Sequence, residues 1–162
     1  MSSKNLDTAI VNFFNTPNPI VNGFYHFFSV ISSVIVCLIV IIVFDKTPYK
    51  INIIALLVAA IFIWALKPLS SRPRPFMVNR NIVNRDIFYI NGIHSFPSLQ
   101  VASITILSLM FYYDYNIPVI FPLLPIIVII SRLGLGAHYT TDCLFSFILA
   151  TILYVFIRML SR

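Results

Sequence analysis

The chain alternates between long apolar stretches and short polar connections. Residues 4–16 come first, and their apolar side chains recur at helical spacing beside polar ones, which predicts a short amphipathic helix at a membrane interface. Pro17 and Pro19 are expected to end this helix. Five apolar stretches then follow as candidate membrane-spanning helices: residues 24–44, which are unbroken, 51–66, 98–113, 117–131 and 143–160. The stretch 117–131 carries three prolines and is expected to be irregular at its start.

This pattern predicts an all-α fold, an integral membrane helical bundle of about five spanning helices plus an N-terminal amphipathic interfacial helix. Of the 162 residues, 59% are hydrophobic and only 10% are charged. About a quarter of the residues are charged in a soluble domain, so the composition excludes that class. The length fits one domain over residues 1–162, in which residues 1–23 form the interfacial helix and its connection. Cys37 and Cys143 lie far apart in apolar segments and are expected to be small buried side chains.

The charges indicate the kind of partner. Lys and Arg total 11 against 5 acidic residues, all of them Asp, for a net charge of +6. Nucleic acid is not expected, because its basic groove needs a solvated face and these segments face lipid. A phosphorylated lipid within the bilayer is the expected partner, and the sequence carries no sign of an oligomeric state.

Alternation of the spans brings two polar loops, residues 67–97 and 131–142, to the same membrane face. These loops carry the cations Lys67, Arg74 and Arg132, whose donors suit the oxygens of a phosphate group. Taken singly, such cations more often set the topology of a membrane protein or bind lipid headgroups.

Three further residues add candidate chemistry. Ser98 follows a proline and opens an apolar run, so it lies near a helix N-terminus, where an anion is favoured. His138 and Asp142 are four residues apart and share a face if the segment is helical. An Asp that accepts a hydrogen bond from one imidazole nitrogen leaves the other nitrogen free to attack phosphorus.

Together these residues resemble the type 2 phosphatidic acid phosphatase superfamily, the membrane lipid phosphatases related to vanadium haloperoxidases. The first motif of that family matches at Lys67 and at Arg74 with Pro75, and the third matches at Ser131, Arg132, His138 and Asp142. The resemblance implies that His138 is a nucleophile that forms a phosphohistidine and that Asp142 orients it. It also implies a phosphate-binding set, Lys67, Arg74, Ser98, Leu99 and Arg132, and a reaction that needs no metal or other cofactor.

The second motif departs from the family pattern. It reads Pro97, Ser98, Leu99, Gln100, where the family has Gly and then His at the last two places. That His is the family's general acid, and Gln100 cannot release a proton at useful pH. Loss of a general acid typically costs about 10²- to 10⁴-fold in rate. Three explanations are open: a substrate with a good leaving group, such as a diphosphate lipid; His94 as a substitute acid; or a relative that has lost its activity.

The expected function is therefore that of a lipid phosphate or diphosphate phosphatase, with undecaprenyl diphosphate as the expected substrate. The alternatives are a lipid phosphotransferase with the same intermediate and a non-catalytic lipid-binding relative. Basic side chains on the face opposite the two loops suit the cytoplasm, namely Lys46, Lys50, Arg158 and Arg162. The expected location is thus the bacterial inner membrane, with the active site facing outward.

Overall fold

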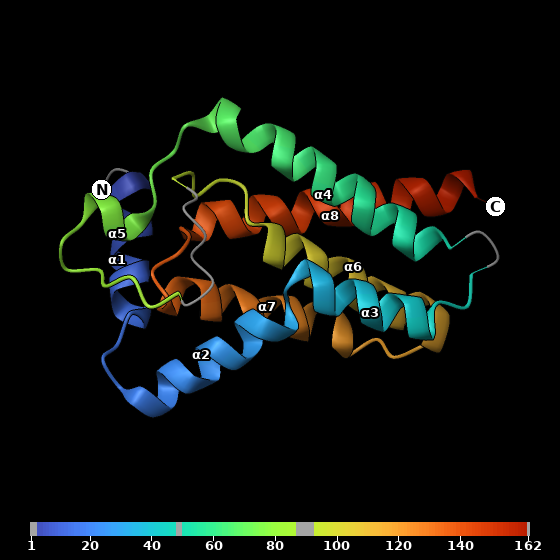
Figure 1. Ribbon diagram of the computed structural model, residues 1–162, viewed down its shortest axis with the longest axis horizontal. Helices are drawn as coiled ribbons and strands as arrows, with labels where there is room; N and C mark the ends of the chain where they lie inside the picture. The colour runs from blue at the N-terminus through green and yellow to red at the C-terminus, as the bar shows by residue number, and fades with distance from the viewer. Residues whose placement is uncertain (1–2, 48–49, 87–92, 162) are drawn as a thin grey trace.

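A central helix organises the structure. The computed structural model describes residues 3–47, 50–86 and 93–161, and within these ranges it has eight helices and no strand. The helix α6 (Leu99–Tyr115) is buried continuously from Val101 to Met110. Four helices pack around it, namely α3 (Val34–Phe44), α4 (Ile51–Ser70), α7 (Ile120–Gly134) and α8 (Thr140–Leu160) (Figure 1). A helix that is apolar on all sides belongs in a core. The predicted all-α bundle is therefore confirmed.

Helix length and composition identify candidate membrane spans among the described residues. By length and composition, α4 and α8 are able to cross a membrane. A third candidate is the pair formed by α2 (Pro19–Ile31) and α3, which is bent by 54° at its break. The helix α7 is apolar but shorter. The predicted count of five spans stays a prediction.

The first predicted span, residues 24–44, is not the unbroken helix expected. The chain leaves the helix at Ser32 and Ser33. The Ser33 hydroxyl accepts a hydrogen bond from the Val36 N–H at 3.4 Å, and the Ser32 hydroxyl donates to the Ser29 carbonyl at 3.2 Å. Serine side chains can bond backbone groups at a break in a helix, and this local bonding competes with the continuous helix that the apolar pattern favours.

The N-terminal segment also differs in detail from the expectation. The predicted amphipathic helix is α1 (Ser3–Phe14), which ends before Pro17. Pro19 does not end it but is the first residue of α2, and the Asn18 side chain caps that helix by accepting from the Ile20 and Val21 N–H groups. Proline suits a first helical position because the N–H it lacks has no partner there. Residues 19–23 are therefore helical rather than a connection.

The two polar loops are shorter than predicted. The helix α4 continues through Lys67 to Ser70, and a short helix, α5 (Pro75–Val78), interrupts the first loop. In the second loop, α7 runs on to Gly134 and α8 begins at Thr140. The predicted irregular start of α7 is confirmed, because Phe121 has a non-helical backbone there.

Close packing joins α2 to α7. The Tyr25 ring of α2 lies directly over Gly134, where an added Cβ atom would overlap the ring. Beside it, the Ser131 hydroxyl donates to the Tyr25 carbonyl at 2.7 Å. Gly134 is thus the residue that lets the two helices approach.

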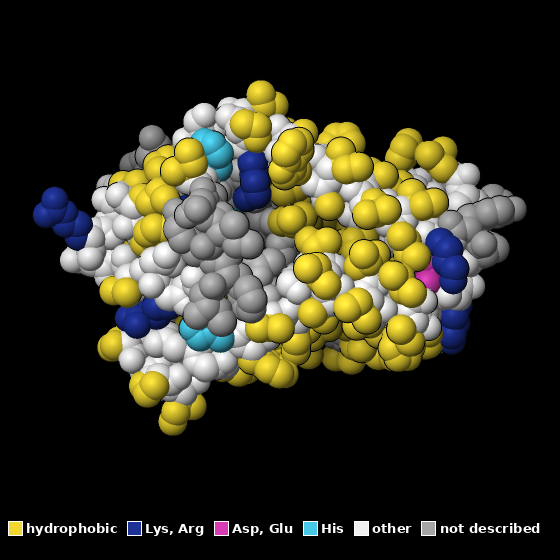
Figure 2. Space-filling view, viewed as in Figure 1, with side chains coloured by type: hydrophobic (Ala, Val, Ile, Leu, Met, Phe, Trp, Pro, Cys, Tyr) yellow, Lys and Arg dark blue, Asp and Glu magenta, His cyan; other side chains and the backbone are white. Residues whose placement is uncertain are grey.

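The surface fits a protein embedded in a bilayer. On the face shown in Figure 2, apolar side chains cover most of the right-hand part, and Lys and Arg side chains show at its far end and over the left-hand part. Exposed apolar residues include Ile61 and Trp64 on α4 and Ile152 and Phe156 on α8. Long apolar side chains exposed along the middle of a helical bundle are typical of a lipid-facing surface.

The contact at Gly134 predicts an asymmetry between two glycines. Gly134→Ala forces a methyl group into the Tyr25 ring and should destabilise the protein by about 1–3 kcal/mol, the usual range for overpacking. Gly23→Ala is the matched control on α2, because among the described residues no atom beyond its own stretch of helix lies within 4 Å of the added methyl group. Thermal unfolding in detergent should show a lower midpoint for Gly134→Ala only. A midpoint for Gly134→Ala equal to that of the wild type would contradict the packing described.

Candidate active site

The residues singled out from the sequence meet at the end of the bundle where α1 and α5 lie (Figure 1). They come from several elements: Lys67 from the last turn of α4, Arg74 from the residue before α5, Ser98 from the N-cap of α6, Arg132 from the last turn of α7 and His138 from the turn before α8. The positive charges of Lys67, Arg74 and Arg132 all act on His138. The fold therefore gathers three cations around one imidazole.

The imidazole of His138 is held in one tautomer. Its side chain is buried, and Nδ1 lies 2.5 Å from the carbonyl oxygen of Ser95. A carbonyl oxygen only accepts hydrogen bonds, so Nδ1 carries the hydrogen and donates it. The lone pair of the neutral ring is then on Nε2, which is the atom able to act as a nucleophile.

The surroundings of His138 favour this neutral form. Burial lowers its pKa well below the usual value, and the charges of Arg132, Arg74 and Lys67 lower it further. The hydrogen bond to the Ser95 carbonyl opposes this shift but does not reverse it. A neutral imidazole is the form that attacks phosphorus.

Asp142 does not make the expected hydrogen bond to the imidazole. Its Oδ2 atom is 3.9 Å from Nδ1 of His138, which is beyond hydrogen-bond distance. It instead accepts from the Tyr139 N–H at 2.9 Å and from Nη1 of Arg72 at 2.6 Å. The physical reason is its place in the first turn of α8, where backbone N–H groups need acceptors.

Arg72 was not singled out from the sequence, although it lies within the first motif segment. Its guanidinium bridges Asp142 and, at 3.0 Å, Asp7. Its carbonyl accepts the Ser95 N–H at 2.8 Å. Asp142 is thus linked to His138 indirectly, through Arg72 and then Ser95. The sequence feature that could have identified Arg72 is its position as a further arginine between the motif residues Lys67 and Arg74.

Asp7 ties α1 to this arrangement. It is 5% exposed and accepts from the Thr141 hydroxyl at 2.6 Å as well as from Arg72. A second anchor lies at the end of α1, where the Asn15 amide donates to the Gly134 carbonyl at 2.8 Å. The helix predicted to lie at the interface therefore also covers the site. An acidic residue within the amphipathic segment was the only sequence signal for this.

Arg132 is buried and bonded through two of its nitrogens. It is 2% exposed, its Nη2 pairs with the Asp86 carboxylate at 2.5 Å, and its Nη1 donates to the Ser29 hydroxyl at 2.7 Å. Its Nε has no hydrogen-bond partner among the described residues. Neither Asp86 nor Ser29 was predicted as a site residue.

The second motif lies at the N-terminus of α6. The Ser98 N–H donates to the Ser146 hydroxyl at 2.7 Å, whereas the Ser98 hydroxyl is buried and without a partner in the described part of the chain. Leu99 is the first residue of α6. The side-chain amide of Gln100 donates to the Ser29 carbonyl at 2.9 Å and to the Ser29 hydroxyl at 3.0 Å.

Two other predicted residues have looser surroundings. Lys67 is half-buried, and within residues 3–47, 50–86 and 93–161 its ammonium group makes no hydrogen bond or ion pair. The backbone of His94 pairs with that of Pro73. In the described part of the chain the His94 side chain makes no hydrogen bond or ion pair, so its role as substitute acid stays a prediction.

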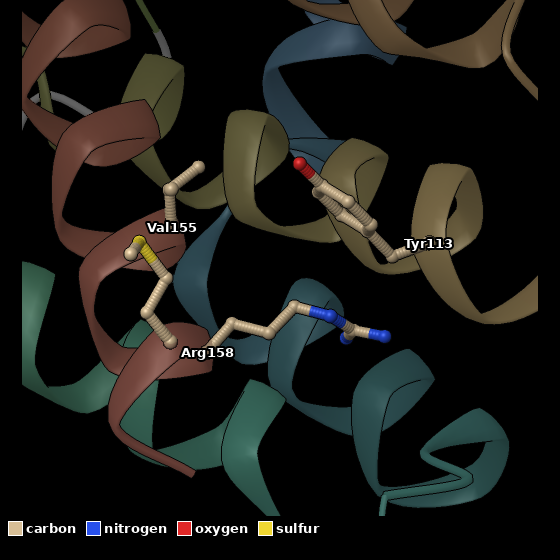
Figure 3. Close-up of a pocket in the computed structure, with 4 residues that line it drawn as sticks. Tyr113, Val155 and Arg158 are labelled. Carbon is tan, nitrogen blue, oxygen red and sulfur yellow. The ribbon is translucent and has the colours of Figure 1, made fainter. Parts of the chain in front are cut away.

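A cavity opens beside these residues. Its volume is about 320 Å³, and Asn5, Thr8, Arg72, Pro73, Val78 and Tyr139 line it. A second and smaller one, of about 100 Å³, lies near the C-terminal end of α8, with Tyr113, Val155, Arg158 and Met159 around it (Figure 3). There Arg158 is already paired with Asp114 at 2.8 Å and donates to the Tyr154 hydroxyl. The larger cavity reaches the site through Arg72 and Tyr139, whereas His138 and Asp142 are not among the residues that line it.

Comparison with known proteins supports one family. The family model described as the PAP2 superfamily matches residues 48–161. No curated protein and no solved structure matches the chain at a significant level. The matched segment begins after α1, α2 and α3. It includes Lys67, Arg74, Ser98, Arg132 and His138.

The surroundings of His138 predict an unusual titration. Because its pKa is lowered, the imidazole should stay neutral as the pH falls through the usual histidine value of about 6.5, and it should gain a proton only at lower pH. NMR of protein labelled with ¹⁵N-histidine, in detergent, measures this midpoint. The signal that disappears in His138→Ala assigns the resonance. A midpoint at or above the usual value would contradict the electrostatics described.

Proposed function

Because the chain belongs to the PAP2 superfamily, whose members are generally phosphatases, we propose that it hydrolyses a lipid phosphate or diphosphate through a phosphohistidine on His138. The observation that carries this proposal is the buried imidazole. Its Nδ1–H is bonded to the Ser95 carbonyl, its Nε2 holds the lone pair, and three cations act on it.

The proposed reaction has two steps. In the first, Nε2 of His138 attacks phosphorus and the bond between phosphorus and the leaving oxygen breaks. In the second, water attacks the phosphohistidine, and inorganic phosphate leaves as the imidazole is restored. Lys67, Arg74 and Arg132, with the Ser98 hydroxyl and the N-terminal backbone at Leu99, bind the phosphoryl oxygens and stabilise the charge that develops on them. Asp142 holds Arg72, which in turn holds Ser95 against the imidazole.

The substrate follows from the leaving group. Gln100 cannot protonate the departing oxygen, so a substrate that leaves without protonation is favoured. A diphosphate lipid expels a phosphate monoester, which needs less protonation than an alkoxide. Undecaprenyl diphosphate, converted to undecaprenyl phosphate, is the proposed substrate.

A second candidate is a lipid-binding protein without catalysis. The observation in its favour is that the Gln100 amide is occupied with Ser29 and offers no acid. A phosphotransferase would share the phosphohistidine and replace water by a lipid acceptor. The retained pair of His138 and Asp142 favours the two enzyme proposals over simple binding.

Phosphate release from undecaprenyl diphosphate by the purified protein tests the proposal. The wild type should release phosphate, and His138→Ala should abolish release because the nucleophile is gone. Gln100→His is the informative companion. If only Gln100→His releases phosphate, the protein has lost its general acid and lipid binding becomes the better proposal. If none of the three proteins releases phosphate, hydrolysis of this lipid is excluded.

We also propose that the active-site end faces outward from the bacterial inner membrane. Lys46 and Arg158 lie at the opposite end of the bundle, and positive side chains are enriched on the cytoplasmic side. Asn81→Cys tests this, because Asn81 is exposed in the first loop while Cys37 and Cys143 are buried and give little background. The new cysteine should react with an impermeant thiol reagent in intact cells. Protection there, with reaction in lysed cells, would reverse the orientation.

A further inference from the structure

Ser29 of α2 contacts two motif residues although it lies outside the segment matched by the family model. Its side chain is fully buried. Its hydroxyl oxygen is 2.7 Å from Nη1 of Arg132 and 3.0 Å from Nε2 of Gln100. One serine thus joins the residue that departs from the family pattern to a cation of the third motif.

The direction of both hydrogen bonds is fixed by chemistry. A guanidinium only donates, so the Ser29 hydroxyl accepts from Arg132. The Gln100 amide also faces the Ser29 carbonyl at 2.9 Å. That carbonyl only accepts, so the amide nitrogen rather than the amide oxygen faces Ser29. The Ser29 hydroxyl therefore accepts a second hydrogen bond from Gln100.

These two bonds leave one hydrogen without a partner. A hydroxyl accepts two hydrogen bonds and donates one. With both acceptor positions of Ser29 filled, its hydrogen must point in a third direction, and within the described residues no acceptor receives it. The Ser98 hydroxyl and Nε of Arg132 are also buried donors without a described partner. Buried donors are normally satisfied, so acceptors are expected at these positions.

We propose that the Ser29 hydroxyl donates a hydrogen bond to the phosphoryl group of the substrate, and that Gln100 is the residue that positions it. This inference rests on the proposed function. No proton is transferred, since the hydroxyl keeps its hydrogen and only stabilises negative charge on an oxygen. Gln100 suits the role because one amide nitrogen carries two N–H donors, whereas an imidazole nitrogen carries at most one. The replacement of His by Gln is then linked to the recruitment of α2 into the site.

The experiment measures binding of orthovanadate, a metal oxyanion that mimics a five-coordinate phosphoryl group, together with phosphate release. Ser29→Ala should weaken vanadate binding by about 10- to 100-fold, the range for a hydrogen bond to a charged group. Ser29→Thr keeps the hydroxyl and should restore most of the affinity. Gln100→Ala keeps Ser29 but removes its anchor, so it should weaken binding by a smaller factor.

Ser108→Ala is the matched control. Ser108 is a fully buried serine on α6 whose hydroxyl already donates to the Ile104 carbonyl at 2.6 Å. Its replacement should leave vanadate affinity unchanged. Thermal unfolding of each variant shows whether a loss of affinity is accompanied by a loss of structure.

The outcomes separate this inference from the proposed function. If Ser29→Ala binds vanadate as tightly as the wild type, Ser29 only joins α2 to α6 and the inference is overturned. If Ser29→Ala does not fold, an unchanged affinity in Gln100→Ala overturns the inference instead. A wild type that binds vanadate and releases phosphate while Ser29→Ala loses both supports it. A wild type that does neither overturns the proposed function and this inference with it.

Discussion

The buried guanidinium of Arg132 is the interaction on which the other parts of the site depend. A charge at 2% exposure is costly unless it is paired and hydrogen-bonded. Its partners are Asp86 and Ser29, so one cation fixes both the connection after α5 and the helix α2 against the end of α7. Burial lowers the pKa of the nearby imidazole, and the charge of Arg132 lowers it further. Arg132 therefore contributes both to the packing of these elements and to the electrostatics around His138.

Arg72 also orders elements around the site. It pairs with two carboxylates, one from α1 and one from α8, and its ring contact with Tyr139 places the guanidinium carbon 4.0 Å from the ring centroid. Arg72 and Arg132 are held by acids and order the elements around the site, whereas the Lys67 ammonium has no ion pair in the part of the chain that the structure describes.

Much of the fold was accessible from the sequence because apolar periodicity reports burial and lipid contact. It located the helices α1, α4, α6 and α8 to within a few residues, and motif spacing singled out residues that the fold does bring together. The helix break at Ser32 and Ser33 was not predicted because the flanking Val and Ile residues dominate the hydropathy of this stretch. Ser29 and Asp7 could not be predicted because their arginine partners are 103 and 65 residues away in the sequence. The hydrogen bond from His138 to Ser95 could not be predicted because its acceptor is a backbone atom.

The partners of the two arginines have a consequence for how such chains can diversify. Asp7 and Ser29 belong to helices that precede the family-matched segment, whereas Arg72 and Arg132 lie inside it. The segment matched by the family model and the unit that folds therefore have different boundaries. Recombination between relatives near residue 48 would transfer the matched segment whole. It would nevertheless separate Arg72 from Asp7 and Arg132 from Ser29. Compatible N-terminal helices must accordingly be inherited together with the segment they cover.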